Sequence, residues 1–218
     1  MIDYLLGNYN RLFTVLTQHM QIVGLTLLYS IILASVITVL VMRSKLLSNL
    51  VITLLGAVYS IPSLALFAIL IPFLGIGRNT AIVVLVAYNQ FLLLKNFIAG
   101  FDSVDSTLIE AAIGMGMPYR LVLWKVKLPL AFPAIMAGIH LSVISTIGIA
   151  TIAATINAGG IGVLLFEGLR TFNTTKILWG TIMAAGVAIL MNLILKAIQR
   201  IVDRRFHAPK SKHSSDKY

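Results

Sequence analysis

The chain has 218 residues, of which 59% are hydrophobic and only 11% are charged. A soluble domain carries about 25% charged residues, so this composition excludes a soluble globular protein. The formal net charge is nevertheless +10, and surplus cations in an apolar chain indicate a membrane protein with basic cytoplasmic loops. We expect no nucleic-acid partner, because a nucleic-acid-binding domain needs a charged face on a polar surface.

The runs between charged residues predict five membrane spans, since a spanning helix needs about 20 apolar residues. The first is densest over Ile22–Met42 and follows a short extracytoplasmic segment, residues 1–20. No basic n-region with a cleavage site precedes it, so we expect this span to be retained. The other spans of the transmembrane domain (21–201) are expected within Leu46–Gly77, Asn79–Leu94 (extendable to about Ala99), Leu128–Phe166 and Ile177–Leu195.

Pro62 interrupts the second of these runs. The 11 residues from Ser63 to Phe73 form a helix of only about 16 Å, which is too short to cross about 30 Å of hydrocarbon. We therefore predict one span, about Leu50–Phe73, with a kink near Ser60–Ser63. A proline frees a backbone carbonyl that a neighbour or cavity water must satisfy, so the kink serves either packing or a pathway.

The cations predict the orientation of the chain. If the carboxyl terminus is cytoplasmic, 13 of the 17 Lys and Arg residues lie inside, which favours N-out, C-in. Residues 202–218 then form a basic cytoplasmic tail that helps to set topology, with contact to anionic membrane lipid as the alternative. The four cations expected outside are Arg11, Arg78, Arg170 and Lys176.

The longest cytoplasmic connection, Phe101–Leu128, has the signals of ordered structure. Gly116 and Pro118 predict two short helices separated by a turn, and Glu110 approximates a capping box with Ser106 or Thr107. A short ordered helix in such a loop is suited to a groove on a partner protein. Three consecutive residues can cap its first helix: Asp105, Ser106 and Thr107.

A specific motif lies in this connection. Glu110-Ala111-Ala112 is followed after three residues by Gly116, and Pro129 comes 13 residues after Gly116. This pattern resembles the EAA motif of ABC importer permeases, and the resemblance runs from about residue 20 to 201. Three further stretches resemble the osmoprotectant subgroup, which imports glycine betaine, carnitine or choline: Ser60–Ala65, Gly114–Met117 and Ile149–Gly162.

The resemblance implies an all-α, polytopic fold of the type I ABC importer permease kind in the bacterial cytoplasmic membrane. It implies that 101–128 docks on a dimer of ATP-binding subunits, that a second permease copy or paralogue completes the pathway, and that an extracytoplasmic substrate-binding protein delivers the solute. The sequence contains no GxxxxGK[ST] phosphate loop. We therefore expect no enzyme activity and no cofactor on this chain, with ATP and Mg on the ATPase. The coupling residues that the resemblance indicates are Glu110, Ala111, Ala112, Gly114, Gly116, Pro118 and Pro129.

Polar groups inside the predicted spans are candidates for the pathway, with hydrogen bonds between helices as the alternative role. His140 lies near the bilayer centre, where the subgroup more often has arginine, and Phe67 is a further aromatic that could contact a quaternary ammonium. The family places a gate near the glycine-rich turn after the fourth span, and an ordinary flexible loop is the alternative. The pathway or gate candidates are Tyr59, Ser60, Pro62, Tyr88, Asn89, Gln90, His140, Gly159 and Gly160.

The sequence leaves alternatives to an osmoprotectant permease. The same architecture serves methionine, polar amino acids and ergothioneine. A stand-alone channel or secondary carrier would show an inverted repeat or intramembrane acids, but none of the seven acids falls in a predicted span. A metal site is not expected, because the chain has no cysteine and no HExxH motif.

Overall fold

The chain is a bundle of long helices in the computed structural model, which describes residues 2–206, with the backbone alone for 203–206. That part of the chain contains no β-strand, so the predicted all-α fold is confirmed. In chain order the helices are α1 (Ile2–Val41), α2 (Lys45–Tyr59), α3 (Ser63–Leu74), α4 (Arg78–Asp102), α5 (Ser106–Gly114), α6 (Tyr119–Val122), the π-helix η1 (Leu123–Lys127), α7 (Leu128–Ile152), the 3₁₀-helix η2 (Ala153–Ile156), α8 (Gly162–Arg170) and α9 (Thr174–Phe206).

The predicted spans correspond to these helices. Within residues 2–206, α1, α4, α9 and the continuous stretch Tyr119–Ile156 are each long and apolar enough to cross a membrane, and the pair α2–α3 supplies a fifth crossing if it counts as one span. The tail predicted at 202–218 begins inside α9, which continues to Phe206. Its remainder lies outside the described residues.

α1 is much longer than the predicted first span. Its 40 residues extend about 60 Å, twice the thickness of the hydrocarbon layer. Residues 2–20 therefore continue the helix, with one local irregularity at Asn8 (φ −130°, ψ 18°). Leu12 and Val15 in this extension are buried against Leu164 of α8. The extension is helical because it has packing partners beyond the span.

The prediction of a single kinked helix over Leu50–Phe73 is wrong, because α2 and α3 meet at 94°. Pro62 has no N–H, and its ring disfavours helical backbone at the preceding residue. The Ser60 hydroxyl donates to the Gly56 carbonyl at 2.9 Å, and the Tyr88 hydroxyl donates to the Ile61 carbonyl. The Ser60 and Tyr88 hydroxyls thus satisfy two carbonyls at the break. The chain therefore forms two helices at a sharp angle instead of one kinked helix.

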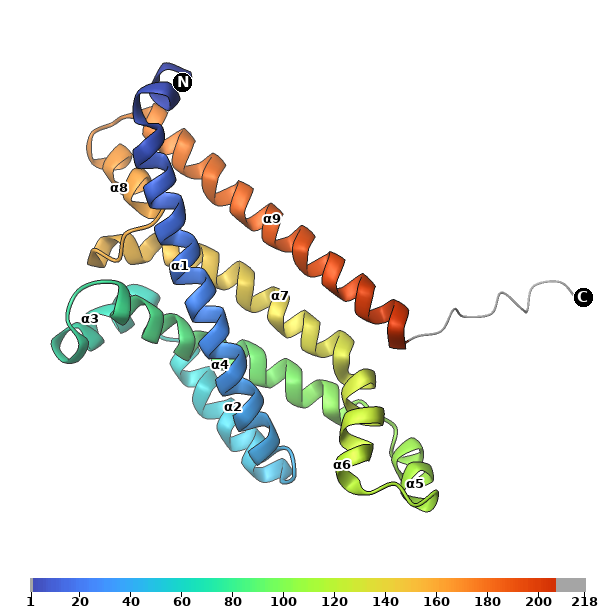
Figure 1. The fold of residues 1–218 in the computed structure, drawn as a ribbon. Coiled ribbons are helices and arrows are strands. Elements are labelled where there is room, and N and C mark those ends of the chain that lie inside the picture. Colours follow the sequence, from blue (N-terminus) through green and yellow to red (C-terminus); the bar gives the residue numbers. More distant parts are fainter. Residues whose placement is uncertain (1, 207–218) are drawn as a thin grey trace, which may run out of the picture.

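α4 is the centre of the bundle (Figure 1). It packs most extensively against α7 and α1, and then against α2 and α3. Val84, Leu93 and Leu94 of α4 are fully buried. In the most apolar 18-residue window of each helix, 61% of the residues are buried in α4 but only 11% in α9. α4 is therefore a core helix, while α9 presents most of its surface outside the protomer.

The two ends of the bundle carry different elements. The α1–α2 turn and the α5–α6 segment lie at one end, and the amino terminus and α8 lie at the other (Figure 1). Arg43 and Lys45 follow α1 at the first end, while Arg11 and Lys176 meet Glu167 of α8 at the second. The amino terminus with α8 and the cytoplasmic connection with α5 therefore lie at opposite ends (Figure 1), which is compatible with the predicted N-out, C-in topology.

The hydrogen bond at the α2–α3 break yields a stability prediction. Tyr88→Phe leaves the Ile61 carbonyl without its donor in an apolar surrounding, so we expect a loss of about 1–3 kcal/mol of stability, seen as a lower midpoint of thermal unfolding in detergent. Tyr59→Phe is the matched control, because its ring contacts remain and its hydroxyl makes no hydrogen bond within the described residues. Equal midpoints for the two variants would contradict this role for Tyr88.

Candidate functional site

The first predicted coupling helix, α5, begins at a side-chain cap. Asp105 is the capping residue, and its Oδ1 accepts from the Thr107 N–H at 2.9 Å. This backbone hydrogen bond lowers the pKa of the exposed Asp105 carboxyl. Since the cap is Asp105, Glu110 falls beyond the third helical position that a capping box requires. Glu110 is instead an exposed acid with no partner among the described side chains.

α5 ends in a Schellman motif around Gly116. Gly116 has φ +84°, its N–H bonds to the Ile113 carbonyl at 2.8 Å, and the Met117 N–H bonds to the Ala112 carbonyl at 3.1 Å. A glycine adopts this left-handed conformation without the strain that a side chain causes. Pro118 then precedes α6 with extended backbone. The first predicted short helix and the Gly-Pro turn are confirmed, whereas the second predicted helix is the beginning of a longer one, because α6 continues without a break into η1 and α7.

α5 has one anchored side and several exposed apolar groups. Ala112 is buried, whereas Ala111, Ile113 and Met115 are exposed, Met115 to 77%. No atom outside its own helical turns lies within 4 Å of a Cβ placed on Gly114. Exposed apolar side chains on a short helix outside the hydrocarbon layer are costly in water, and they suit a docking surface.

A π-helical segment joins this loop to a span. η1 runs directly from α6 into α7, and the Leu128 N–H bonds to the Leu123 carbonyl five residues back. Pro129, at the start of α7, has no N–H to offer a carbonyl of the preceding turn, which is compatible with the wider register. The π-helix was not predicted. Pro129 was its only local signal, and a proline near a helix start is also compatible with an ordinary α-helix.

Asn89 and Gln90 lie in the interior of the bundle. The Asn89 amide donates to the Thr146 hydroxyl at 2.8 Å and to the Ser30 hydroxyl at 3.3 Å, and the Gln90 amide donates to the Ser30 carbonyl at 3.3 Å. These bonds join α4 to α1 and α7. The contacts favour the structural alternative for both residues, as the bond to Ile61 does for Tyr88.

The remaining pathway candidates occupy different environments. Tyr59 is 37% exposed, and its ring lies edge-on to Tyr88 with centroids 5.6 Å apart. Phe67 is fully buried in the core. His140 is half-buried on α7, and its Nε2 is buried without a hydrogen-bond partner within the described residues. The structure therefore groups Tyr59, Ser60 and Pro62 at the α2–α3 break but does not bring His140 into that group by any described contact.

The glycine-rich turn packs against α1. Gly159 and Gly160 have φ +82° and +83°, and the Gly160 N–H donates to Gln18 Oε1 at 3.1 Å. A Cβ on Gly160 would lie 3.1 Å from Nδ1 of His19, which is fully buried. The turn is therefore seated on α1 and is not a free loop. Gln18 and His19 were not among the predicted gate residues, because their proximity to a turn 140 residues away leaves no mark in the sequence.

An ion-pair cluster fastens the same end of the molecule. Glu167 of α8 pairs with Lys176 of α9 at 2.7 Å and with Arg11 of α1. The Lys176 hydrogen bond and, after it, Arg11 lower the pKa of the Glu167 carboxyl. The two ion pairs thereby link α1, α8 and α9 at the end of the molecule that carries the glycine-rich turn.

Comparisons with known proteins agree with the motif. Residues 12–208 match the family described as "Binding-protein-dependent transport system inner membrane component". The carnitine transport permease protein OpuCD of Listeria monocytogenes serotype 1/2a is 33% identical over 204 residues, which cover 93% of this chain and 92% of that protein. The glycine betaine/carnitine/choline transport system permease protein OpuCB of Bacillus subtilis is 35% identical over 202 residues, covering 93% of each.

A solved structure shares the fold. The MetNI methionine ABC transporter in an inward-facing conformation matches with a TM-score of 0.79 and 20% identity, covering 88% of this chain and 95% of that chain. At this identity the likeness supports the architecture alone.

The Glu167 cluster predicts a pH dependence. Because the pKa of Glu167 is lowered from its ordinary value of 4.5, the cluster contributes fully above pH 4.5 and is lost as the pH falls through the lowered pKa. Hydrogen exchange of the α8 backbone amides, corrected for the pH dependence of the intrinsic exchange rate, should therefore accelerate as the pH falls through the lowered pKa of Glu167. Glu167→Gln should show the acid-state protection already at neutral pH. Identical α8 protection in Glu167→Gln and wild type would contradict the role of the cluster.

Proposed function

Because the chain belongs to the family of inner-membrane components of binding-protein-dependent transport systems, we propose that its α5 is the coupling helix of an importer for trimethylammonium osmoprotectants. The chain is a translocation subunit of an ABC importer in the inner membrane, and ATP hydrolysis belongs to a separate ATPase. Membership of the family implies a substrate-binding protein as the other partner. ATP and Mg bind the ATPase and not this chain.

The exposed side of α5 carries the coupling proposal. Leu108, Ile113 and Met115 are the apolar groups that enter a groove on the ATPase. Glu110 lies on the exposed helix without a partner among the described side chains, so a basic residue of the ATPase can pair with it. Gly114 has room for close approach of a partner backbone. Gly116 ends the helix tightly enough for Pro118 to start the next one.

Movement of α5 reaches the spans through the Gly116–Pro118 turn and then through the continuous helical stretch Tyr119–Ile156. η1 joins α6 to α7 without a loop, and the Asn89 amide ties α7 to α4 through Thr146. A displacement of α5 toward or away from the ATPase therefore moves α7 together with the core helix. In this proposal the spans alternate access as the ATPase subunits close and separate.

The cargo proposal rests on the relatives and on the aromatic groups at the break. Carnitine, glycine betaine and choline, named for the two relatives, share a trimethylammonium group, which is attracted to aromatic faces. The half-exposed Tyr59 lies beside Ser60 and Pro62 at the sharp α2–α3 turn. These three residues form the pathway contact that we propose, with Gly159 and Gly160 as its outer gate.

A second permease subunit completes the pathway. α9 is free of charged residues from Ile177 to Leu195, yet only 11% of its apolar 18-residue window is buried inside the protomer. One side of α9 faces lipid, and we assign the other to the second subunit, either an identical copy or a paralogue.

Coupling can be tested at Gly116. Gly116→Val places a β-branched residue at φ +84°, which strains the end of α5 by at least about 1 kcal/mol, so we expect solute uptake to fall at least about tenfold at equal membrane abundance. ATP hydrolysis by the assembled transporter should lose its stimulation by the loaded binding protein. Gly24→Val on the exposed face of α1, also without atoms within 4 Å of its Cβ, is the control. Wild-type uptake by Gly116→Val would refute the assignment of α5.

Cargo can be tested through the partner. The chain is purified with its ATPase and binding protein, and the binding protein is titrated with carnitine, glycine betaine, choline, methionine and ergothioneine. We expect carnitine, glycine betaine or choline to bind and to drive uptake by the reconstituted transporter. Selective binding of methionine or ergothioneine would overturn the cargo proposal and leave the coupling proposal intact.

A further inference from the structure

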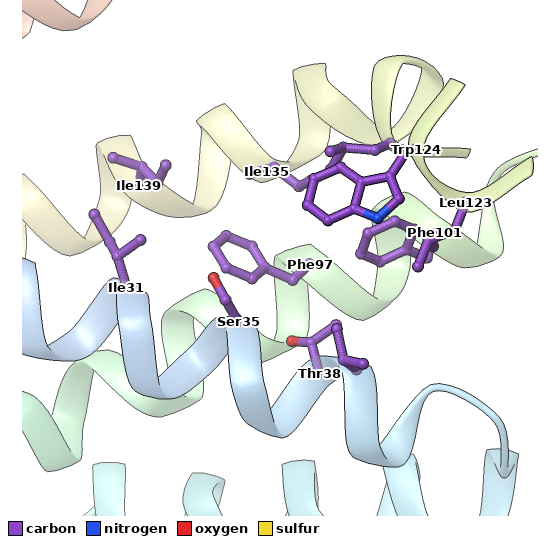
Figure 2. Close-up of a pocket in the computed structure, with 11 residues that line it drawn as sticks. Ile31, Ser35, Thr38, Phe97, Phe101, Leu123, Trp124, Ile135 and Ile139 are labelled. Atoms are coloured by element: carbon purple, nitrogen blue, oxygen red, sulfur yellow. The ribbon is translucent and has the colours of Figure 1, made fainter. Parts of the chain in front are cut away.

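An apolar cavity lies between the cytoplasmic halves of three helices. It has a volume of about 280 Å³ and opens between α1, α4 and the start of α7, with Trp124 of η1 extending over it toward Phe97 and Phe101 (Figure 2). Ser35 and Thr38 supply the only side-chain hydroxyls of its wall. The full wall is Ile31, Ser35, Thr38, Val39, Phe97, Phe101, Leu123, Trp124, Leu128, Ile135 and Ile139.

A second cavity continues this one toward the cytoplasmic end. Its volume is about 250 Å³, and it shares Val39, Leu123 and Trp124 with the first cavity. Its other walls include Arg43, Tyr119 and Arg120. The two cavities are therefore neighbours, and we refer to them together as the groove; the walls of both are almost entirely apolar, and the side chains of Arg43 and Arg120 border the outer one.

The two arginines at the outer end are available to a ligand. The Arg43 guanidinium lies 5.6 Å from the centre of the Tyr119 ring, which holds it beside the groove. No carboxylate pairs with Arg43 or Arg120 among the side chains that the structure describes. Both are exposed. Two arginines that border the same cavity and have no acidic partner among the described side chains can both donate to an anion such as phosphate.

The length of the groove matches one leaflet of a bilayer. Ile31 and Arg43 are 12 residues apart on the chain, or about 18 Å if helical rise is kept, and half of the hydrocarbon core is about 15 Å. Arg43 therefore lies near the headgroup level when Ile31 lies near the bilayer centre. The positive-inside distribution places this end at the cytoplasmic leaflet.

We propose that the groove binds an anionic phospholipid of the cytoplasmic leaflet, with one acyl chain in the apolar section and the phosphate between Arg43 and Arg120. A free phosphate ion would leave the apolar section empty. One turn of a partner helix, about 10 Å across and about 5.4 Å long, occupies more space than the larger cavity, which has about 280 Å³, so a partner protein could insert only a side chain. Zwitterionic lipid fills the apolar section equally well but leaves the net positive charge of the arginines uncompensated.

The lipid would lie against the joint between the coupling segment and α7. Trp124 belongs to η1 and covers the acyl chain, while Ile135 and Ile139 of α7 line its other side. Binding of the lipid does not depend on the cargo or on docking of the ATPase, so this proposal stands apart from the proposed function.

The test uses photoactivatable lipids and the assembled transporter in vesicles. Phosphatidylglycerol and phosphatidylcholine with a diazirine in the acyl chain are supplied separately at equal low mole fraction, and crosslinked peptides are mapped by mass spectrometry. We expect phosphatidylglycerol to label the peptides that contain Ser35 and Trp124 at least about fivefold more than phosphatidylcholine does. Arg43→Gln/Arg120→Gln should abolish this preference, whereas Lys45→Gln, a cation at the same end but outside the groove, should retain it.

A steric pair of variants tests the apolar section. Ser35→Phe fills the groove and should reduce labelling at Trp124 at least about fivefold, whereas Val36→Phe on the adjacent exposed position of α1 should not. Equal labelling by the two lipids would overturn the proposal in favour of ordinary boundary lipid. Labelling at exposed Leu40 but not at Ser35 or Trp124 would overturn it in favour of a protein side chain in the groove. A preference retained in Arg43→Gln/Arg120→Gln would also overturn it.

Discussion

The amide of Asn89 holds the core of this protein together. It donates to hydroxyls on α1 and on α7 from the most buried helix, α4, in a setting where water cannot replace a lost partner. Within a bilayer the hydrophobic effect does not drive helices together, because the lipid tails are as apolar as the helices. Packing and interhelical hydrogen bonds therefore decide which helix faces meet. The three-helix core is the fixed frame to which the α2–α3 break, the Glu167 ion-pair cluster and the α5–α6 segment are attached.

The same requirement to satisfy polar groups explains the break in the second span. The Ile61 carbonyl, which has no helical partner at the break before Pro62, accepts from the Tyr88 hydroxyl of α4, so the chain can turn by 94° without leaving this carbonyl unpaired in hydrocarbon. The turn places Tyr59 and Ser60 at a corner instead of along a helix face. The break at Pro62 therefore has a defined geometry, because α4 supplies the hydroxyl donor for the adjacent Ile61 carbonyl.

The two ends of the bundle are built by different means. At the outer end, Glu167 joins three elements through ion pairs, and the glycine-rich turn is seated on Gln18 and His19. At the opposite end, α5 has Ala112 as its buried residue and leaves Leu108, Ile113 and Met115 exposed. One end is thus held by ion pairs and a packed turn, while the other carries an exposed helix that leads through η1 into α7.

The sequence by itself determined the class of the protein. Composition and charge-free runs predicted an all-α membrane fold, the motif from Glu110 to Pro129 predicted an ABC importer permease, and Gly116 with Pro118 predicted the turn that ends α5. These features are local, or they are sums over the chain, and they need no knowledge of what touches what. The comparisons confirm the family, and the helix boundaries confirm the spans apart from the broken second one.

The tertiary structure alone decided the rest. It showed that α1 continues to Ile2, because α8 supplies a packing surface that no periodicity reveals. It turned the expected kink into a right-angled break, since Tyr88 lies 27 residues from its acceptor. It also gave Asn89 and Gln90 their partners some 60 residues away, and it brought Arg43 to Tyr119 beside an apolar groove. Contacts between residues so far apart in the sequence depend on how the helices cross. A single sequence specifies the side chains but does not reveal the crossing geometry.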